Sequence, residues 1–198
     1  PRPIIIMIQA GAAVDQQMEL LRPYLEKNDI MIDAGNANFR DTMRRFDALK
    51  DSGLTFIGMG VSGGEEGARH GPSIMVGGTE DSWKRVEKVL TSIAAKYNDD
   101  PCVAWLGENG AGHFVKTIHN GIEYADMQMI AEIYGILRDG LKMSASEISA
   151  VFGEWNKGRL ESYLTELTAT VLAARDTIGG GPMVDMILDK AGQKGTGK

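Results

Sequence analysis

The first half of the chain alternates short, uninterrupted apolar runs with helix-like spacing, and this alternation constrains the fold most. The apolar runs occupy residues 4–8, 30–32 and 54–57. Runs without polar interruptions are typical of strands covered on both faces, as in a parallel sheet. Apolar residues three or four positions apart lie between them, at Val14, Met18 and Leu21 and at Met43, Phe46 and Leu49. Strands alternating with helices in this way predict βαβ units and an α/β domain.

The second half favours helices throughout. Residues 112–141 form one long helical pattern. Ser144 and Glu147 have the spacing of a capping box, which predicts the start of the next helix. Residues 161–175 are helical again, and Pro182 stands at a plausible first position of a last helix. An all-helical part is therefore expected to follow the α/β part.

Composition narrows the function classes. The formal net charge of −6 argues against a nucleic-acid partner, because a protein that binds the phosphate backbone needs a basic excess. The single cysteine excludes a disulfide framework and a cysteine-based zinc site. Neither a membrane-spanning apolar run nor a signal peptide is visible. We expect a cytoplasmic protein without a membrane or nucleic-acid partner. Because the chain opens directly on a strand, we also expect that the beginning of the polypeptide is missing from this sequence.

Two glycine patterns imitate nucleotide-binding motifs. Gly58, Gly60 and Gly63 satisfy G-x-G-x-x-G after a strand. The dinucleotide fingerprint also needs a helix that opens at the third glycine. The following EEGARHGPS contains two glycines and a proline, so we expect no helix there and reject the motif. The closing GQKGTGK fits a P-loop up to Lys198, but helical rather than strand spacing precedes it, and we reject it too.

Four polar residues form one narrow stripe on the long helix. Lys116, His119, Asn120 and Glu123 stand at i, i+3, i+4 and i+7. A solvated polar face is the alternative, but such faces usually repeat Lys and Glu rather than His and Asn. Lys and Glu two turns apart could act as base and acid on one small molecule. The rest of the helix is expected to be packed, through Phe114, Val115, Ile118, Ile122 and Ala125.

Those two roles have physical requirements. A lysine acts as a base only if desolvation or a neighbouring charge brings its pKa towards neutrality, and a glutamate acts as an acid only if burial raises its pKa. Both need a closed, partly apolar site.

Polar and glycine residues also follow three of the expected strands, where open α/β sheets bind ligands. Three strand ends at one edge form better evidence than any one of them, although each could be a simple turn. The residues concerned are Gln9, Gly11, Asn36, Ser62, Gly63 and Gly64.

Long motifs give the chain a family resemblance. GVSGGEEGARHGPS (60–73), GAGHFVKTIHNGIEY (110–124) and GQKGTGK (192–198) closely resemble segments of the 6-phosphogluconate dehydrogenase family, in order and spacing. IQAGAAVD and DAGNANFRDT resemble further segments. The resemblance implies an α/β Rossmann-type fold, the C-terminal part of an NADP-binding domain, over residues 1–109. It implies the start of an all-helical substrate and dimerisation domain over residues 110–198.

The family oxidises 6-phosphogluconate with NADP and decarboxylates it to ribulose 5-phosphate and CO2, without a metal. By resemblance, Lys116 would exchange the proton of the C3 oxygen, and Glu123 would protonate C1 of the enediol. The resemblance also implies a homodimer that serves the pentose phosphate pathway and gluconate utilisation. Matching positions for the substrate are Asn36, Ser62, Gly63, Gly64, His119 and Asn120, with Tyr124 and Lys194 for its phosphate. Matching positions for NADP are Ile8, Gln9, Ala10 and Asn36.

Two departures and two alternatives remain. Gln9 stands where many members have Lys, and Ala34 where many have Gly, so cofactor contacts could differ. A related β-hydroxyacid dehydrogenase that does not decarboxylate shares the pattern at 110–120, but Glu123, Tyr124 and Lys194 argue against it. A truncated, non-catalytic paralogue that binds sugar phosphates or pairs with a full-length subunit is the other alternative. Residues 1–198 alone are expected to be inactive.

Overall fold

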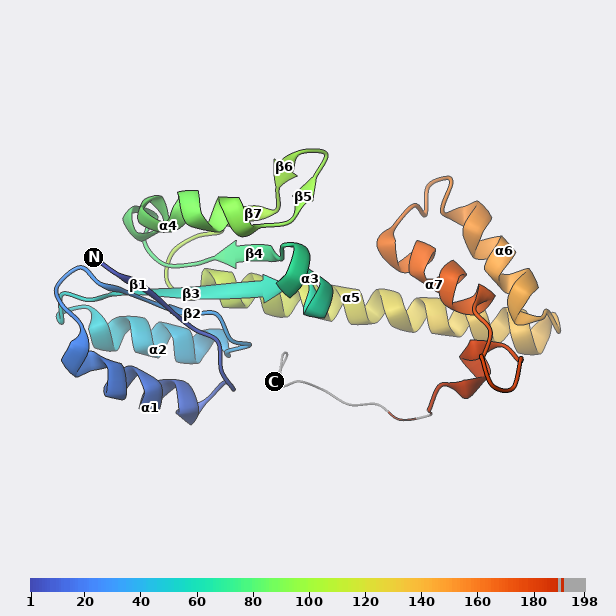
Figure 1. Ribbon diagram of the computed structural model, residues 1–198, viewed down its shortest axis with the longest axis horizontal. Coiled ribbons are helices and arrows are strands. Elements are labelled where there is room, and N and C mark those ends of the chain that lie inside the picture. The colour runs from blue at the N-terminus through green and yellow to red at the C-terminus, as the bar shows by residue number, and fades with distance from the viewer. Residues whose placement is uncertain (189, 191–198) are drawn as a thin grey trace. The chain divides into compact units, whose positions relative to one another are not determined.

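The computed structural model describes residues 1–188 and 190. A five-stranded sheet forms the centre of its first compact unit, residues 1–121 (Figure 1). In spatial order the strands are β1 (Pro3–Ile6), β2 (Ile30–Asp33), β3 (Thr55–Ser62), β4 (Ser73–Val76) and β7 (Val103–Trp105). β1, β2 and β3 are parallel, as the apolar runs predict. β4 is antiparallel to β3, and β7 is parallel to β4. The expected α/β fold is confirmed, with one reversed strand that the sequence did not reveal.

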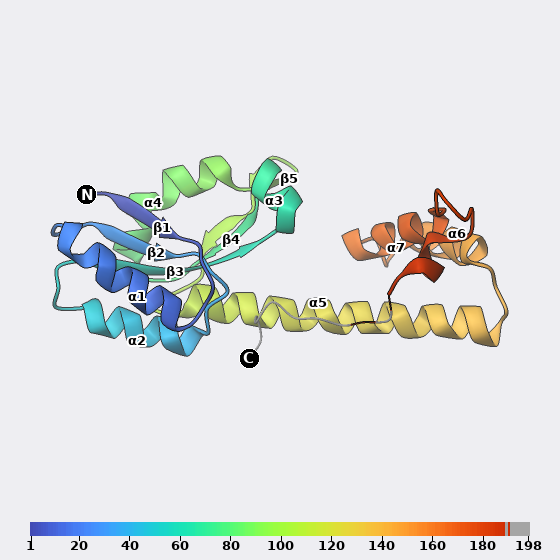
Figure 2. The ribbon, with the colours of Figure 1, turned by 60° about the horizontal axis from the view of Figure 1, so that its bottom comes forward.

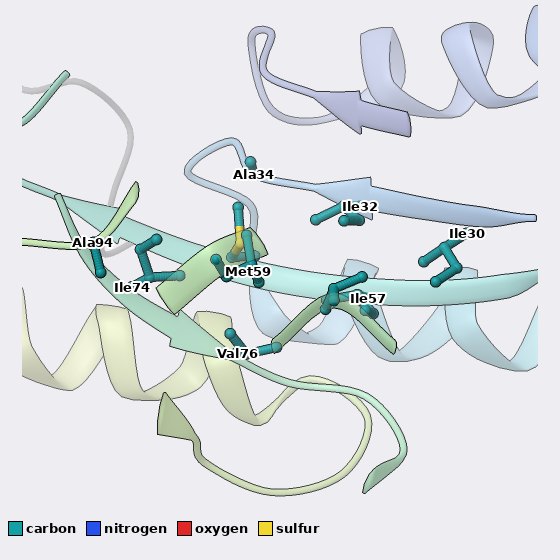
Figure 3. Packing of buried hydrophobic residues seen from close by; sticks show 10 residues of the cluster. Ile30, Ile32, Ala34, Ile57, Met59, Ile74, Val76 and Ala94 are labelled. Atoms are coloured by element: carbon teal, nitrogen blue, oxygen red, sulfur yellow. The ribbon is translucent and has the colours of Figure 1, made fainter. Parts of the chain in front are cut away.

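Helices cover both faces of this sheet (Figure 2). α1 (Ala12–Leu21) and α2 (Phe39–Leu49) pack on the face that carries Met31 and Phe56. α4 (Glu80–Ile93) packs on the opposite face, where Ile32, Ile57 and Val76 belong to a buried cluster (Figure 3). Side chains alternate between the faces of a strand, so each run needs apolar residues at every position.

Shorter elements complete the first unit. The 3₁₀ turn η1 (Arg22–Tyr24) follows α1, and a two-stranded ribbon consists of β5 (Lys96–Tyr97) and β6 (Asp100–Pro101). The third short element is α3 (Gly64–His70), which begins directly after Gly63.

The expectation that no helix follows Gly63 is therefore wrong. Gly63 and Gly64 both have positive φ, which lets the chain turn sharply into α3. Glu65 and Glu66 lie in the first turn and Arg69 in the last, so the charges favour the helix despite its glycine. The fingerprint remains excluded for another reason. α3 has only seven residues and leads to an antiparallel strand, whereas the dinucleotide motif belongs to a parallel βαβ unit.

The long helical pattern is confirmed as α5 (Ala111–Gly135), continued by a π-helical turn, η2 (Ile136–Gly140). The boundary between the two compact units falls within α5, after Gly121. The boundary expected between residues 109 and 110 stays a prediction.

The second compact unit contains a helical hairpin with its own small core. α6 (Ala145–Trp155) begins with the predicted capping box, since Ser144 and Glu147 bond reciprocally. α7 (Tyr163–Ala173) packs against α6 around Ile148, Phe152 and Leu172. The predicted helix from Pro182 is wrong, because only the 3₁₀ turn η3 (Met183–Met186) forms and Pro182 caps it in an extended conformation.

Within residues 1–188 and 190, no helix combines the length and apolar character needed to cross a membrane.

Candidate active site

Glycines at the middle of β3 allow the first turns of α5 to lie directly on the sheet. A Cβ atom at Gly60 would lie 2.6 Å from Cβ of Lys116 and 2.9 Å from the carbonyl oxygen of Gly112. A Cβ at Gly58 would lie 2.9 Å from Nδ1 of His113. Real Cβ atoms do not approach other atoms so closely, so neither position accepts a side chain. The glycines that imitate a nucleotide fingerprint are thus the contact surface for α5.

Lys116 is buried by this contact, with 7% of its surface exposed. Its stem lies against Gly60, on the face of the sheet that also carries α2. Removal of an ammonium group from water disfavours its charged form. The structure therefore confirms that Lys116 is withdrawn from solvent, as the sequence analysis requires of a lysine base.

The opposite arc of α5 is mostly exposed among the described residues, so the expectation of a packed arc is wrong except at Val115, which is half-buried. Phe114 and Ile118 are 46% and 48% exposed, and Ile122 is exposed as well. The tight contact with β3 fixes which face of α5 meets the sheet, and that face carries Gly112, His113 and Lys116. An edge-to-face contact with Phe39 of α2 is the one ring contact that Phe114 makes in the described part of the chain.

The carboxyl ends of β1, β2 and β3 meet at one edge, as expected, because these neighbouring strands are parallel. A Cβ at Gly35 would lie 2.9 Å from the carbonyl oxygen of Ile8, so the loops after β1 and β2 are in close approach. Asn36 is half-buried in the second loop, next to Gly35. Ile8, Gln9 and Ala10 are exposed. This edge offers backbone and amide groups to a ligand.

The end of β3 brings Ser62, Gly63 and Gly64 to the same edge. Ser62 is half-buried, and the two glycines are exposed. Their φ values of 145° and 57° lie in the region that side chains disfavour. The two exposed glycines of this turn leave its surface free of side chains, so a ligand could approach the backbone closely.

The remaining polar residues of α5 are more exposed than Lys116. His119 is exposed, and its Nδ1 lies 3.1 Å from Oδ1 of the half-buried Asn120. In the second compact unit, Glu123 is half-buried and Tyr124 is exposed. Lys194 lies outside the described residues.

His113 is a site residue that sequence reasoning missed. Its ring is 1% exposed, with Nε2 3.0 Å from the carbonyl oxygen of Gly35 and Nδ1 2.7 Å from Oγ1 of Thr42. Burial lowers the pKa of His113, against the pull of the Asp33 carboxylate, which raises it. The available signal was a histidine between glycine and phenylalanine at the start of a helix.

A network of ion pairs around the buried Arg45 stabilises the same edge of the sheet. Arg45 is 1% exposed and bonds Asp15 at 2.9 Å and Asp33 at 3.2 Å. It also donates to the carbonyl oxygen of Gly11. Hydrogen bonds from Arg45 and Arg44 lower the pKa of Asp15 to about 2. α1, α2 and the loop after β1 are thus held together.

Side chains that bind metal ions do not cluster in the described part of the chain. Across the described ranges, no three His, Cys, Asp or Glu side chains gather in a way that could hold a metal ion.

Comparisons with known proteins agree over the whole chain. Residues 2–107 match the NAD binding domain of 6-phosphogluconate dehydrogenase, and residues 112–198 match the 6-phosphogluconate dehydrogenase C-terminal domain. The NADP(+)-dependent, decarboxylating 6-phosphogluconate dehydrogenase of Bacillus subtilis (strain 168) is 54% identical over 198 residues. The NAD(+)-dependent, decarboxylating enzyme of the same organism is 52% identical. All of this chain is covered in both alignments, and 42% of each relative.

A solved structure shows the same fold. The Plasmodium falciparum 6-phosphogluconate dehydrogenase, described in its apo form, with its cofactor NADP+ and with its substrate 6-phosphogluconate, superposes with a TM-score of 0.94. It is 45% identical, and the match covers 100% of this chain and 42% of that one. The two domain matches, the identity with both relatives and the shared fold show that the chain belongs to the 6-phosphogluconate dehydrogenase family.

Proposed function

We propose that the polypeptide carrying this chain oxidises and decarboxylates 6-phosphogluconate to ribulose 5-phosphate and CO2, with reduction of NADP. The observation that carries this proposal is the burial of Lys116 against Gly60, beside an edge where three strand ends present polar groups. Family membership and the relatives named above support the same reaction. The chain spans 42% of the length of those relatives, so the activity is proposed for the polypeptide and not for these residues alone.

The residues at the sheet edge fit a dinucleotide. Ile8, Gln9 and Ala10 are exposed at the end of β1, and Asn36 lies in the neighbouring loop, which Gly35 brings close to Ile8. Nucleotides bind open α/β sheets at the carboxyl ends of strands. When bound there, NADP supplies a hydride acceptor for C3 of the substrate.

Lys116 would move the proton of the C3 oxygen. As a neutral amine it accepts this proton while C3 is oxidised. As an ammonium it then donates a hydrogen bond or proton to the keto oxygen, so that the C1 carboxylate leaves as CO2. Its burial keeps bulk water away from this proton exchange.

Glu123 would complete the reaction by protonating the carbon that becomes C1 of ribulose 5-phosphate. It stands seven residues after Lys116 on α5, which corresponds to two helical turns and the same helical face. Ser62, Gly63, Gly64, His119 and Asn120 would hold the sugar chain, with Asn36 between sugar and cofactor. Tyr124 and Lys194 would hold the phosphate. A cytoplasmic homodimer is part of the same proposal.

The first test replaces the proposed base. Lys116→Met in the full-length polypeptide should lower turnover at least ~10³-fold, because both the oxidation and the decarboxylation lose their proton carrier. Lys116→Arg should not restore activity, since a guanidinium stays protonated. NADP-dependent release of CO2 from 6-phosphogluconate is the measurement, with NAD as the competing cofactor.

Lys88→Met on the exposed surface of α4 is the matched control and should retain full activity. Near-normal turnover of Lys116→Met would remove this lysine from the mechanism. A higher kcat/KM with NAD than with NADP would contradict the cofactor assignment.

The second test separates acid from base. Glu123→Gln should lower steady-state turnover strongly while substrate affinity stays within about tenfold, because the amide cannot donate the proton to C1. Deuterium incorporation at C1 of ribulose 5-phosphate, measured in heavy water, reports on this step. Glu132→Gln, exposed on the same helix, is the control. Unchanged stereochemistry and rate of incorporation in Glu123→Gln would show that another group is the acid.

A further inference from the structure

The ring of His113 links the loop after β2 to α2 through two buried hydrogen bonds, and the backbone of Met59 on β3 also interacts with it. Nε2 lies 3.0 Å from the carbonyl oxygen of Gly35, in the loop after β2, and Nδ1 lies 2.7 Å from Oγ1 of Thr42, on α2. The ring itself belongs to the first turns of α5. It therefore links α5 to the loop that carries Asn36.

The chemistry of Gly35 and Thr42 favours one tautomer. A carbonyl oxygen can only accept, so Nε2 must carry the hydrogen that is donated to Gly35. Nδ1 then accepts the hydroxyl hydrogen of Thr42, whose alternative acceptor, the carbonyl oxygen of Asn38, is farther away at 3.3 Å. Burial lowers the pKa of His113, which agrees with a neutral ring.

Gly35 makes two hydrogen bonds and lies close to the loop after β1. Its N–H donates to Oδ1 of Asp33 at 3.1 Å, and its carbonyl accepts from His113. A Cβ atom would lie 2.9 Å from the carbonyl oxygen of Ile8. The carbonyl of Gly35 and the N–H of Asn36 belong to one planar peptide unit. The bond from His113 therefore orients the peptide that leads into Asn36.

We propose that His113 is a positioning residue that sets Asn36 relative to Lys116, an inference that rests on the function proposed above. His113 stands three residues before Lys116, so one turn of α5 carries both. The contact of Lys116 with Gly60 fixes the proposed base on β3, and the bond from His113 to Gly35 fixes the backbone N–H of Asn36. The positions of Lys116 and Asn36 are thereby fixed relative to each other.

Two substitutions of His113 in the full-length polypeptide separate its two bonds. The amide of Asn reaches the place of Nδ1, so His113→Asn keeps a partner for Thr42 and loses the bond to Gly35. The longer Gln reaches the place of Nε2, so His113→Gln keeps a donor for Gly35. We expect His113→Asn to lower kcat at least tenfold and His113→Gln to recover most of that loss.

The primary isotope effect with 6-phosphogluconate deuterated at C3 provides a readout that general destabilisation does not move. It should rise in His113→Asn, because a displaced Asn36 makes hydride transfer slower relative to the other steps. Ile148→Val, in the core of the second compact unit, serves as the destabilised control and should keep the wild-type isotope effect. Equal impairment of both His113 variants, with an unchanged isotope effect, would overturn the proposal.

Structural measurements keep the inference testable if the reaction proves to be a different one. A crystal structure of His113→Asn should show the Gly35–Asn36 peptide rotated, and an unmoved peptide would overturn the proposal. If His113→Asn does not fold, ¹⁵N spectra of the wild-type imidazole decide. Hydrogen on Nε2 at pH 7 supports the proposal, and hydrogen on Nδ1 overturns it. Absence of NADP-dependent turnover in the wild type, by contrast, would contradict only the proposed function.

Discussion

Lys116 and His113 lie one helical turn apart on α5, and both are buried. The sequence singled out Lys116 because three other polar residues repeat at its helical spacing. His113 falls outside that stripe, and its partners, Gly35 and Thr42, are distant in sequence. Periodicity reports neighbours along one helix, whereas a hydrogen bond across 78 residues depends on how the sheet brings two loops together.

The neutral state of His113 makes stability depend on pH. Because burial lowers its pKa in the folded state, the unfolded chain binds more protons than the folded chain below the unfolded pKa of about 6.5. The contribution of His113 is therefore complete above that pH and is lost as the pH falls. The free energy of unfolding should decrease by at most ~1.4 kcal/mol per pH unit between pH 6.5 and 5 from this source.

Urea unfolding at several pH values, on wild type and on His113→Gln, measures this contribution. The difference between the two proteins should shrink as the pH falls, since the variant has no imidazole to protonate. Asp33 and Arg45 lie near the ring and contribute opposite charge effects, which remain present in both proteins. A difference that grows towards acid pH would show that the ring is protonated in the folded state.

At the scale of elements, sequence patterns located most helices and three strands, and failed where backbone geometry decides. Apolar runs predicted β1, β2 and β3, and helical spacing predicted α1, α2, α5 and α7. α3 was missed because glycine propensity was weighed without the positive φ of Gly63 and Gly64, which starts the helix. β4 was not expected at all, because its four residues follow a segment rich in glycine. Its antiparallel direction agrees with a connection from β3 that is shorter than a parallel crossover needs.

The contact between β3 and α5 gives a sharp prediction at this scale. Gly60→Ala places a methyl group 2.6 Å from Cβ of Lys116, so α5 must move away from the sheet. We expect a loss of about 1–3 kcal/mol of stability, as for other overpacked cores, and at least tenfold lower kcat. Thermal unfolding and turnover of the full-length polypeptide measure the two effects.

Gly153→Ala is the matched control, because nothing lies within 4 Å of a Cβ built at this position in α6. Replacing glycine with alanine inside a helix should raise stability by up to ~1 kcal/mol and leave turnover unchanged. Wild-type activity of Gly60→Ala would mean that the placement of Lys116 does not depend on the glycine surface of β3.

At the scale of the whole molecule, residues 1–198 have features that oppose independent function. Among the described residues, no strand pairs with the outer edge of β1, where Ile5 is 49% exposed. Open apolar edges promote association. α1 begins after β1 with Gly11 as its N-cap residue, and the segment QAGAA that leads into it lacks the G-x-G-x-x-G spacing of a dinucleotide turn. α3 is too short and leads to an antiparallel strand.

Residues 1–198 expressed by themselves should therefore bind NADP negligibly, release no CO2 and aggregate. Ile5→Lys should reduce aggregation, because a charged side chain on an edge strand discourages further pairing. Calorimetric titration with NADP, a turnover assay and light scattering test these three outcomes. Micromolar affinity for NADP, or measurable CO2 release, would show that this segment contains a complete nucleotide site.

The glycine surface between β3 and α5 also limits how this protein can change over time. Gly58 and Gly60 on the strand, and Gly112 on the helix, each face backbone or side-chain atoms too close for an added methyl group. A Cβ atom at Gly112 would meet only backbone atoms, of Met75, Gly58 and Gly77, and a Cβ atom at Gly60 would meet the carbonyl oxygen of Gly112. A smaller side chain on the opposite element cannot relieve these backbone contacts. Gly60 and Gly112 are therefore expected to tolerate no compensated substitution, and the position of Lys116 on β3 depends on both of them.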